Sequence, residues 1–180
     1  MGRGSVAKVA VGVAGLLAGL GAGTTSAFGE SVSNGQVQVW VTLGPNGNGG
    51  KVVFTGAIGD YGAAVSTNSS GKPTKNGNYE KLTLKKGTIL VNSTAFNAAG
   101  NSAQPSTDNT TTCSFAFNYS GAVQIVSGTG TYSGITGSLN LTAQFAAVGP
   151  RTKSGSCNQS NSANPLAYFA AVTGSGSVSY

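Results

Sequence analysis

The chain has 180 residues, of which only 8% are charged, and it contains no histidine. This length is sufficient for one domain with a substantial core. The absence of histidine excludes Ser-His-Asp and Cys-His nucleophilic catalysis and the ordinary catalytic zinc sites. The ten basic residues are spread too thinly for the basic face that nucleic-acid binding needs. We therefore expect no metal, no cofactor and no nucleic-acid partner.

Residues 1–27 have the features of a secretory signal peptide. Arg3 and Lys8 form a positive region, an uncharged apolar stretch follows, and Thr25, Ser26 and Ala27 supply the small residues of a cleavage site. Cleavage would leave eight basic and four acidic residues, a net charge of +4. The sequence thus predicts a secreted mature chain without a membrane span. An uncleaved N-terminal anchor that holds the protein in the cell envelope is the alternative.

The remainder of the chain alternates apolar and polar residues with a period of two, which indicates half-buried β-strands. Val37, Val39 and Val41, for example, share one face of the segment 34–43. The segment 97–110 is polar and contains Pro105, so we expect a mobile surface loop there. No segment of ten or more residues shows a helical period. The predicted extended segments, about eight strands in total, are 34–43, 51–58, 63–67, 79–84, 87–96, 112–120, 122–127, 138–148 and 166–180.

About eight strands joined mostly by short turns predict an all-β fold. We expect one domain, residues 28–180, preceded by the signal peptide. Antiparallel strands in this number close naturally into a barrel, because closure removes the exposed edges of the sheet. A two-sheet β-sandwich is the alternative that the sequence pattern leaves open.

Cys113 and Cys157 are the two cysteines of the chain. In an exported protein such a pair predicts a disulfide. The bond would join the segment 149–164, which we expect to be a polar loop, to the strand that begins near Cys113. Metal binding is disfavoured because no histidine is present to complete a site.

One predicted strand carries a row of aromatic residues. Phe115, Phe117 and Tyr119 alternate with polar and small residues, and so share a face with Cys113. Core packing is the simpler interpretation of this face, and the alternative is a ligand cavity. The candidate lining residues are Phe115, Phe117, Tyr119, Phe145 and Tyr168.

Asp60 and Glu80 are the two acidic residues that lie beside predicted strands. They are the candidate functional acids. A glycosidase would need two carboxylates roughly 5–9 Å apart across a cleft, and nothing in the sequence indicates that spacing. The simpler interpretation of Asp60 is a turn aspartate that accepts hydrogen bonds from nearby backbone N–H groups.

The segment 128–137, GTGTYSGITG, lies between two predicted strands. It resembles the G-x-G-x-[YF]-x-G-x-x-G turn of the allene oxide cyclase and dirigent barrel superfamily. The leader resembles those of small exported proteins of actinobacteria. The superfamily resemblance implies an eight-stranded antiparallel barrel, often oligomeric. Plant members cyclise oxylipins in an apolar cavity or steer phenoxy-radical coupling. The matching residues fix a hairpin and perform no chemistry: Gly128, Gly130, Tyr132, Gly134 and Gly137.

The leading hypothesis is therefore a secreted, disulfide-bonded, non-catalytic β-barrel that binds a small apolar ligand or has a cell-envelope role. A homo-oligomer is compatible with it. One alternative is a cyclase-like enzyme acting on an oxylipin-type or aromatic substrate, which requires Asp60 or Glu80 to point into the cavity. The other is a structural or adhesive surface protein, which predicts a filled barrel and self-association.

Overall fold

The structure is a computed structural model that describes residues 31–43, 50–158, 160 and 163–180. The predicted signal peptide, residues 1–27, lies outside the described residues, as does the start of the predicted mature domain. Within the described ranges the chain forms nine β-strands and one short helix. The elements are β1 (Gly35–Leu43), β2 (Gly50–Gly56), β3 (Asp60–Thr67), β4 (Tyr79–Leu84), β5 (Gly87–Asn92), α1 (Thr94–Asn101), β6 (Thr107–Asn109), β7 (Ser114–Gly130), β8 (Thr136–Val148) and β9 (Ala167–Ser179).

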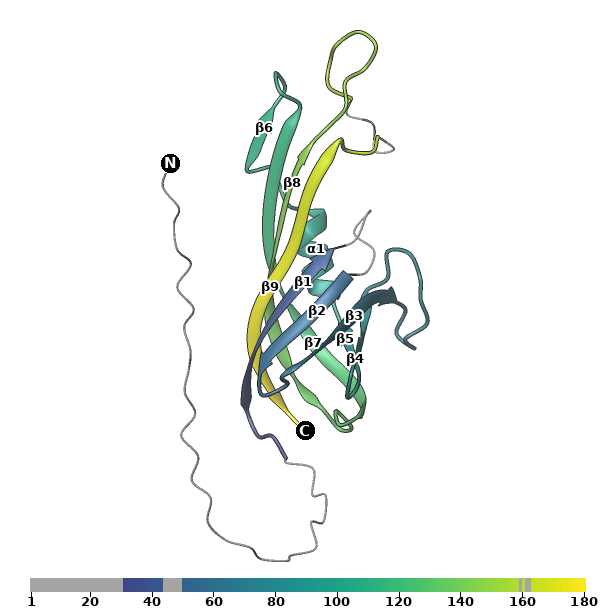
Figure 1. Cartoon of the computed structure of the whole chain (residues 1–180), viewed down its shortest axis with the longest axis vertical. Helices are drawn as coiled ribbons and strands as arrows, with labels where there is room; N and C mark the ends of the chain where they lie inside the picture. The colour runs from purple at the N-terminus through teal and green to yellow at the C-terminus, as the bar shows by residue number, and fades with distance from the viewer. Residues whose placement is uncertain (1–30, 44–49, 159, 161–162) are drawn as a thin grey trace, which may run out of the picture.

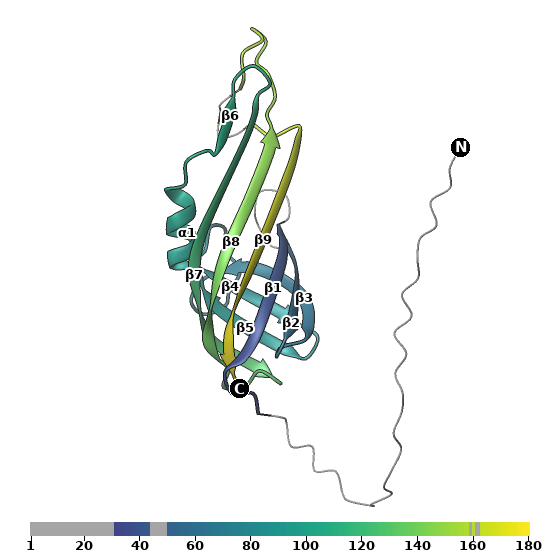
Figure 2. The ribbon, with the colours of Figure 1, turned by 90° about the vertical axis from the view of Figure 1, so that its left-hand side faces the viewer.

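Eight of the strands close into an antiparallel barrel. Their order is β5-β4-β3-β2-β1-β9-β8-β7, and β5 pairs with β7 to complete the ring. Figures 1 and 2 show this ring from two sides. The predicted all-β barrel is therefore confirmed, and the sandwich alternative is not what forms.

The interior of the barrel is filled by the apolar residues of the alternating pattern. On β1, Val37 and Val39 are buried, while their neighbours Gln38 and Trp40 are exposed. The end of the barrel at the β7–β8 turn is closed by Tyr132, which has no exposed surface. The opposite end, where β4 begins and β5 ends, is the one from which β7, β8 and β9 continue.

Strands β7, β8 and β9 extend well beyond the rest of the barrel (Figure 1). The pairing of β1 with β9 reaches only to Ala171, and that of β5 with β7 begins at Gln124. Past these points β8 still pairs with both neighbours, and β6 adds a short edge strand along β7. We call this extension the projecting sheet, and define it as β6 with residues 114–117, 145–148 and 167–170.

Two predictions for the segment 87–110 are wrong. The strand expected to reach Phe96 ends at Asn92, whose side-chain oxygen accepts hydrogen bonds from the backbone N–H and the hydroxyl of Thr94 at 3.0 and 2.7 Å. Helix α1 begins there, and β6 follows it inside the expected loop. The helix has eight residues with a single buried side chain, Phe96, which is too little for a readable helical period.

Strand β7 is one continuous element, although the sequence pattern predicts two strands separated near Gly121. Gly121 lies within the strand and allows close packing; it does not form a turn. A Cβ atom at this position would lie 2.8 Å from the Cα of Phe96. This distance is shorter than the van der Waals contact between a side chain and a neighbouring backbone. Gly121 therefore lets α1 lie directly against the strand, as Figure 2 shows.

Candidate functional site

The open end of the barrel contains a cavity of about 150 Å³. Most of its wall is aliphatic and comes from the barrel strands, including Val39, Leu82 and Leu141. Phe96 of α1 and Tyr119 of β7 also line it. The rings of Phe96 and Tyr119 have centroids 4.9 Å apart. The polar side chains of the cavity are few: Glu80, Ser93 and Asn97.

A second, polar hollow of about 370 Å³ adjoins this cavity. We call it the vestibule. It shares Glu80, Asn97 and Tyr119 with the cavity, so the two spaces meet at these side chains. Its remaining lining is rich in carboxamide groups and comes from the β3–β4 loop, α1 and the strands beside them: Ser66, Asn76, Gly77, Asn78, Gly100, Asn101 and Phe117.

Glu80 is placed on the barrel wall by the alternation of β4. It shares the inward face of that strand with Leu82 and Leu84, which are buried, while Lys81 and Thr83 are exposed. Burial raises the pKa of the Glu80 carboxyl to about 7, although a hydrogen bond with Ser66 opposes the shift. Ser66 is its cross-strand neighbour on β3. The side chain is therefore an acid that gains or loses its proton near neutral pH.

Helix α1 positions the polar corner between cavity and vestibule. The amide of Asn97 donates hydrogen bonds to the backbone carbonyl of Gly77 at 3.1 Å and to Oδ1 of Asn78 at 3.4 Å. These bonds join the helix to the loop that precedes β4. Ser93 and Asn97 were not among the lining residues predicted from the sequence. The available signal was the run Asn92-Ser93-Thr94, because such residues are typical of helix starts.

Asp60 lies at the closed end of the barrel and does not line the cavity. It is 6% exposed and accepts hydrogen bonds from the hydroxyl of Tyr132 at 2.7 Å and from the backbone N–H groups of Tyr61 and Lys86 at 2.8 and 2.9 Å. Burial raises its pKa, but these donors outweigh burial and hold the pKa below the usual value. Asp60 and Glu80 are therefore not brought together as an acid pair.

The segment that resembles the superfamily turn forms the closed end of the barrel. Strand β7 runs to Gly130, and the chain then turns through residues 131–135 before β8 begins. Gly130 and Gly134 have φ values of +63° and +79°, a region that favours glycine. The ring of Tyr132 makes an edge contact with that of Tyr180, with centroids 5.6 Å apart. Gly128 lets the turn pack closely against β7, because a Cβ there would lie 2.6 Å from Cγ2 of Ile135 and 2.9 Å from the Cβ of Tyr132.

The predicted aromatic lining residues divide between the site and the projecting sheet. Tyr119 lines both hollows, and Phe117 lines the vestibule. The ring of Phe145 stacks on those of Phe117 and Phe115, at centroid distances of 4.9 and 5.8 Å. The ring of Tyr168 follows at 6.3 Å from Phe145. A row of stacked aromatic rings thus leads from the vestibule along the projecting sheet.

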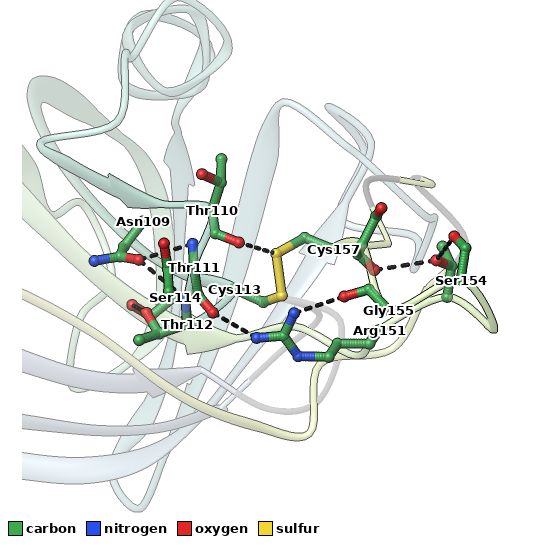
Figure 3. Close-up of a disulfide and its surroundings, with 12 residues drawn as sticks. Asn109, Thr110, Thr111, Thr112, Cys113, Ser114, Arg151, Ser154, Gly155 and Cys157 are labelled. Carbon is green, nitrogen blue, oxygen red and sulfur yellow. Dashed lines mark hydrogen bonds between the residues drawn. A yellow bond between two sulfur atoms is a disulfide. The ribbon is translucent and has the colours of Figure 1, made fainter.

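The predicted disulfide between Cys113 and Cys157 is present (Figure 3). It joins the start of β7 to the loop between β8 and β9, at the far end of the projecting sheet. Beside it the guanidinium group of Arg151 donates hydrogen bonds to the backbone carbonyls of Thr111 and Gly155 (Figure 3). The two loops at this end are thereby held together by a covalent bond and by a cation.

Both faces of the projecting sheet carry exposed apolar surface. Phe169 is 59% exposed and Tyr168 is 40% exposed. A shallow groove of about 400 Å³ runs over this part of the sheet, bordered by Phe115, Ala116, Ala146, Ala147, Tyr168 and Phe169. None of the strands β7, β8 and β9 contains a charged residue.

Among the described residues, no three His, Cys, Asp or Glu side chains gather in a way that could hold a metal ion. In the same part of the chain no helix is long and apolar enough to cross a membrane. Comparison with protein-family models, curated proteins and solved structures finds no match to this chain. The fold and the site therefore define the class: a closed, disulfide-bonded antiparallel barrel with an apolar cavity at one end.

Proposed function

We propose that the protein binds a small, largely apolar molecule in the open end of its barrel. The observation that carries the proposal is the aliphatic cavity of about 150 Å³ that adjoins a polar vestibule. An apolar cavity of this order accommodates a group about the size of benzene. Sites of this kind bind ligands by apolar contact and orient them with a few polar groups. Here Glu80 and Asn97 are those groups.

The test uses two leucine substitutions on neighbouring residues of β3. Ala64 lines the cavity and is 7% exposed, whereas Ala63 lies on the outer face of the same strand and is exposed. Binding of benzyl alcohol is measured by NMR titration and by native mass spectrometry. Ala64→Leu should weaken binding at least about tenfold because it fills the cavity, and Ala63→Leu should leave binding unchanged. Equal binding of benzyl alcohol by the natural protein and by both variants would overturn the proposal.

We place this activity outside the cytoplasm. The disulfide supports that location, because such bonds persist in oxidising compartments. The eight-stranded barrel and the position of the glycine-framed turn support kinship with the allene oxide cyclase and dirigent barrels. Mass spectrometry of the protein recovered from its native host's culture medium tests the location. A chain that begins near residue 28 is expected, and a cell-associated chain that retains residues 1–27 would favour the anchored alternative.

A cyclase-like enzyme is the second candidate, and the position of Glu80 favours it. An acid at the cavity rim with a pKa of about 7 is suited to exchange a proton with a bound substrate. On this candidate, Glu80→Gln abolishes turnover of an oxylipin epoxide or an aromatic substrate while its binding persists. Turnover that is unaffected by the substitution would exclude Glu80 as the acid–base group.

A structural role is the third candidate, and the absence of charged residues from strands β7, β8 and β9 of the projecting sheet favours it. The occupant that we propose for this sheet is a second copy of the chain. The mature chain expected after cleavage carries a net charge of +4, so two copies repel each other wherever their lysines face. Strands β7, β8 and β9 carry no charge and allow close approach without that repulsion. Phe169→Lys, which places a charge on this surface, should therefore reduce self-association in sedimentation equilibrium.

A further inference from the structure

The Glu80 carboxyl group lacks an ionic partner within the described part of the chain. Its hydrogen-bond partner is the neutral hydroxyl of Ser66, and no charged group contributes to its pKa. The lysine and arginine side chains of the described residues are absent from the lining of both the cavity and the vestibule. A carboxylate beside an aliphatic wall is costly unless it is protonated or paired with a cation.

The polar groups around Glu80 are uncharged hydroxyls, carboxamides and a backbone carbonyl. The carbonyl of Gly77 and Oδ1 of Asn78 face the same corner, where Asn97 donates to both. Tyr119, from β7, is the other titratable residue among the described lining residues, and burial raises its pKa, so it is neutral near physiological pH. This corner therefore has a negative potential when Glu80 is ionised, which disfavours anionic ligands.

We infer that the ligand is a small amine, whose ammonium group pairs with the Glu80 carboxylate while its apolar part occupies the barrel cavity. This inference rests on the proposed function. The shared position of Glu80 between the cavity and the vestibule supplies the geometry, because one molecule can reach both spaces. A partly buried carboxylate forms stronger hydrogen bonds with a cationic donor than with a neutral one.

The experiment compares three probes of nearly equal size that differ in charge: benzylamine, benzyl alcohol and benzoate. Dissociation constants are measured by NMR titration at pH 8, where Glu80 is ionised. Benzylamine should bind at least about tenfold more tightly than benzyl alcohol, and benzoate should bind more weakly than the alcohol. The preference for the amine should decrease when the pH is lowered to 6, because protonation of Glu80 removes the attractive charge.

Two substitutions separate this inference from the proposed function. Glu80→Gln keeps the shape of the side chain and removes its charge, so the amine and the alcohol should bind with similar affinity. Asp108→Asn removes an exposed carboxylate on β6, remote from the site, and should preserve the preference for the amine. An alcohol that binds the natural protein as well as the amine does, or an amine preference that survives Glu80→Gln, would overturn the inference alone. Failure of all three probes to bind would overturn the proposed function as well.

Discussion

The hydroxyl of Tyr132 donates a 2.7 Å hydrogen bond to the carboxylate of Asp60, and the two residues are 72 positions apart in the sequence. The bond joins the β7–β8 turn to the start of β3 at the closed end of the barrel. Tyr132 is fully buried, and burial together with this hydrogen bond raises the pKa of its hydroxyl. Residues that stood in the sequence as separate candidates, a motif tyrosine and a functional acid, are thus one structural unit.

Removal of this hydroxyl should destabilise the barrel. Tyr132→Phe leaves the buried Asp60 with one donor fewer, and hydrogen bonds to charged groups contribute about 1.5–3 kcal/mol. We expect the free energy of unfolding in urea to fall by that amount at pH 7. Because the pKa of Asp60 is lowered in the folded state, the stability that it supplies is present above pH 3.8 and is lost as the carboxyl protonates in acid. The difference between the two proteins should therefore shrink below that pH.

The control is Tyr61→Phe, which removes a hydroxyl from the neighbouring residue of β3. Tyr61 is 57% exposed, so its loss should change the free energy of unfolding by less than about 0.5 kcal/mol. A Tyr132→Phe protein as stable as the natural one would contradict the role assigned to the bond.

Glu80 should make the protein less stable as the pH rises. Its pKa is 4.5 in the unfolded chain and about 7 in the fold, so between these values the unfolded chain loses a proton that the folded protein keeps. The free energy of unfolding should therefore decrease as the pH rises from 4.5 to 7. Water in the vestibule screens the partly buried group, so we expect a total decrease of about 1–2 kcal/mol rather than the full value of the shift.

Glu80→Gln tests this dependence by denaturation at a series of pH values. The variant should lack the decrease and should be more stable than the natural protein at pH 8. Asp108→Asn, which removes a surface carboxylate, should retain it. A natural protein whose stability is constant between pH 4.5 and 7 would show that the Glu80 carboxyl titrates as it does in water.

Reduction of the Cys113–Cys157 bond should loosen the projecting sheet before the barrel. The bond closes a loop of 44 residues, for which chain entropy predicts a loss of about 4 kcal/mol in the free energy of unfolding. Because the bond lies at the far end of the projecting sheet, hydrogen exchange should accelerate first in the loop between β8 and β9 and at the start of β7.

The matching control is the double variant Cys113→Ser, Cys157→Ser, which should show this exchange pattern without reductant and should not respond to it. Equal acceleration in strands β1 to β5 would contradict a local role for the bond.

The projecting sheet should mediate self-association. Phe169 presents a 59% exposed ring on strands without charges, and exposed apolar patches of this kind mark interaction sites. Phe169→Lys should shift the protein toward monomer in sedimentation equilibrium. Val53→Lys is the control, because Val53 is 46% exposed on β2, in the barrel wall. A natural protein that is monomeric at millimolar concentration would exclude this role.

The sequence alone determined the class of the fold, because strand periodicity is local. The buried face of each strand is visible as alternate apolar residues, as in Val37 and Val39, and this pattern predicts about eight strands. The structure joins two of the predicted segments, 112–120 and 122–127, into the single strand β7. The disulfide followed from the presence of only two cysteines in a chain with an apparent export signal. Glu80 could be singled out because acidic residues beside strands are so rare here.

Only the tertiary structure decided which of these residues act together. Helix α1 has one buried side chain, so its sequence shows no helical periodicity from which it could be predicted. The helix forms because β7 offers a packing surface at Gly121. The aromatic row of β7 has the alternation of a core strand, but β7 extends beyond its partner β5, just as β9 extends beyond β1, so Phe115 and Phe117 lie beyond the closed barrel. Pairing between distant segments decides how far each strand extends beyond its neighbours. It therefore also decides which end of the barrel is open. That pairing places Asp60 at the closed end and Glu80 at the open one.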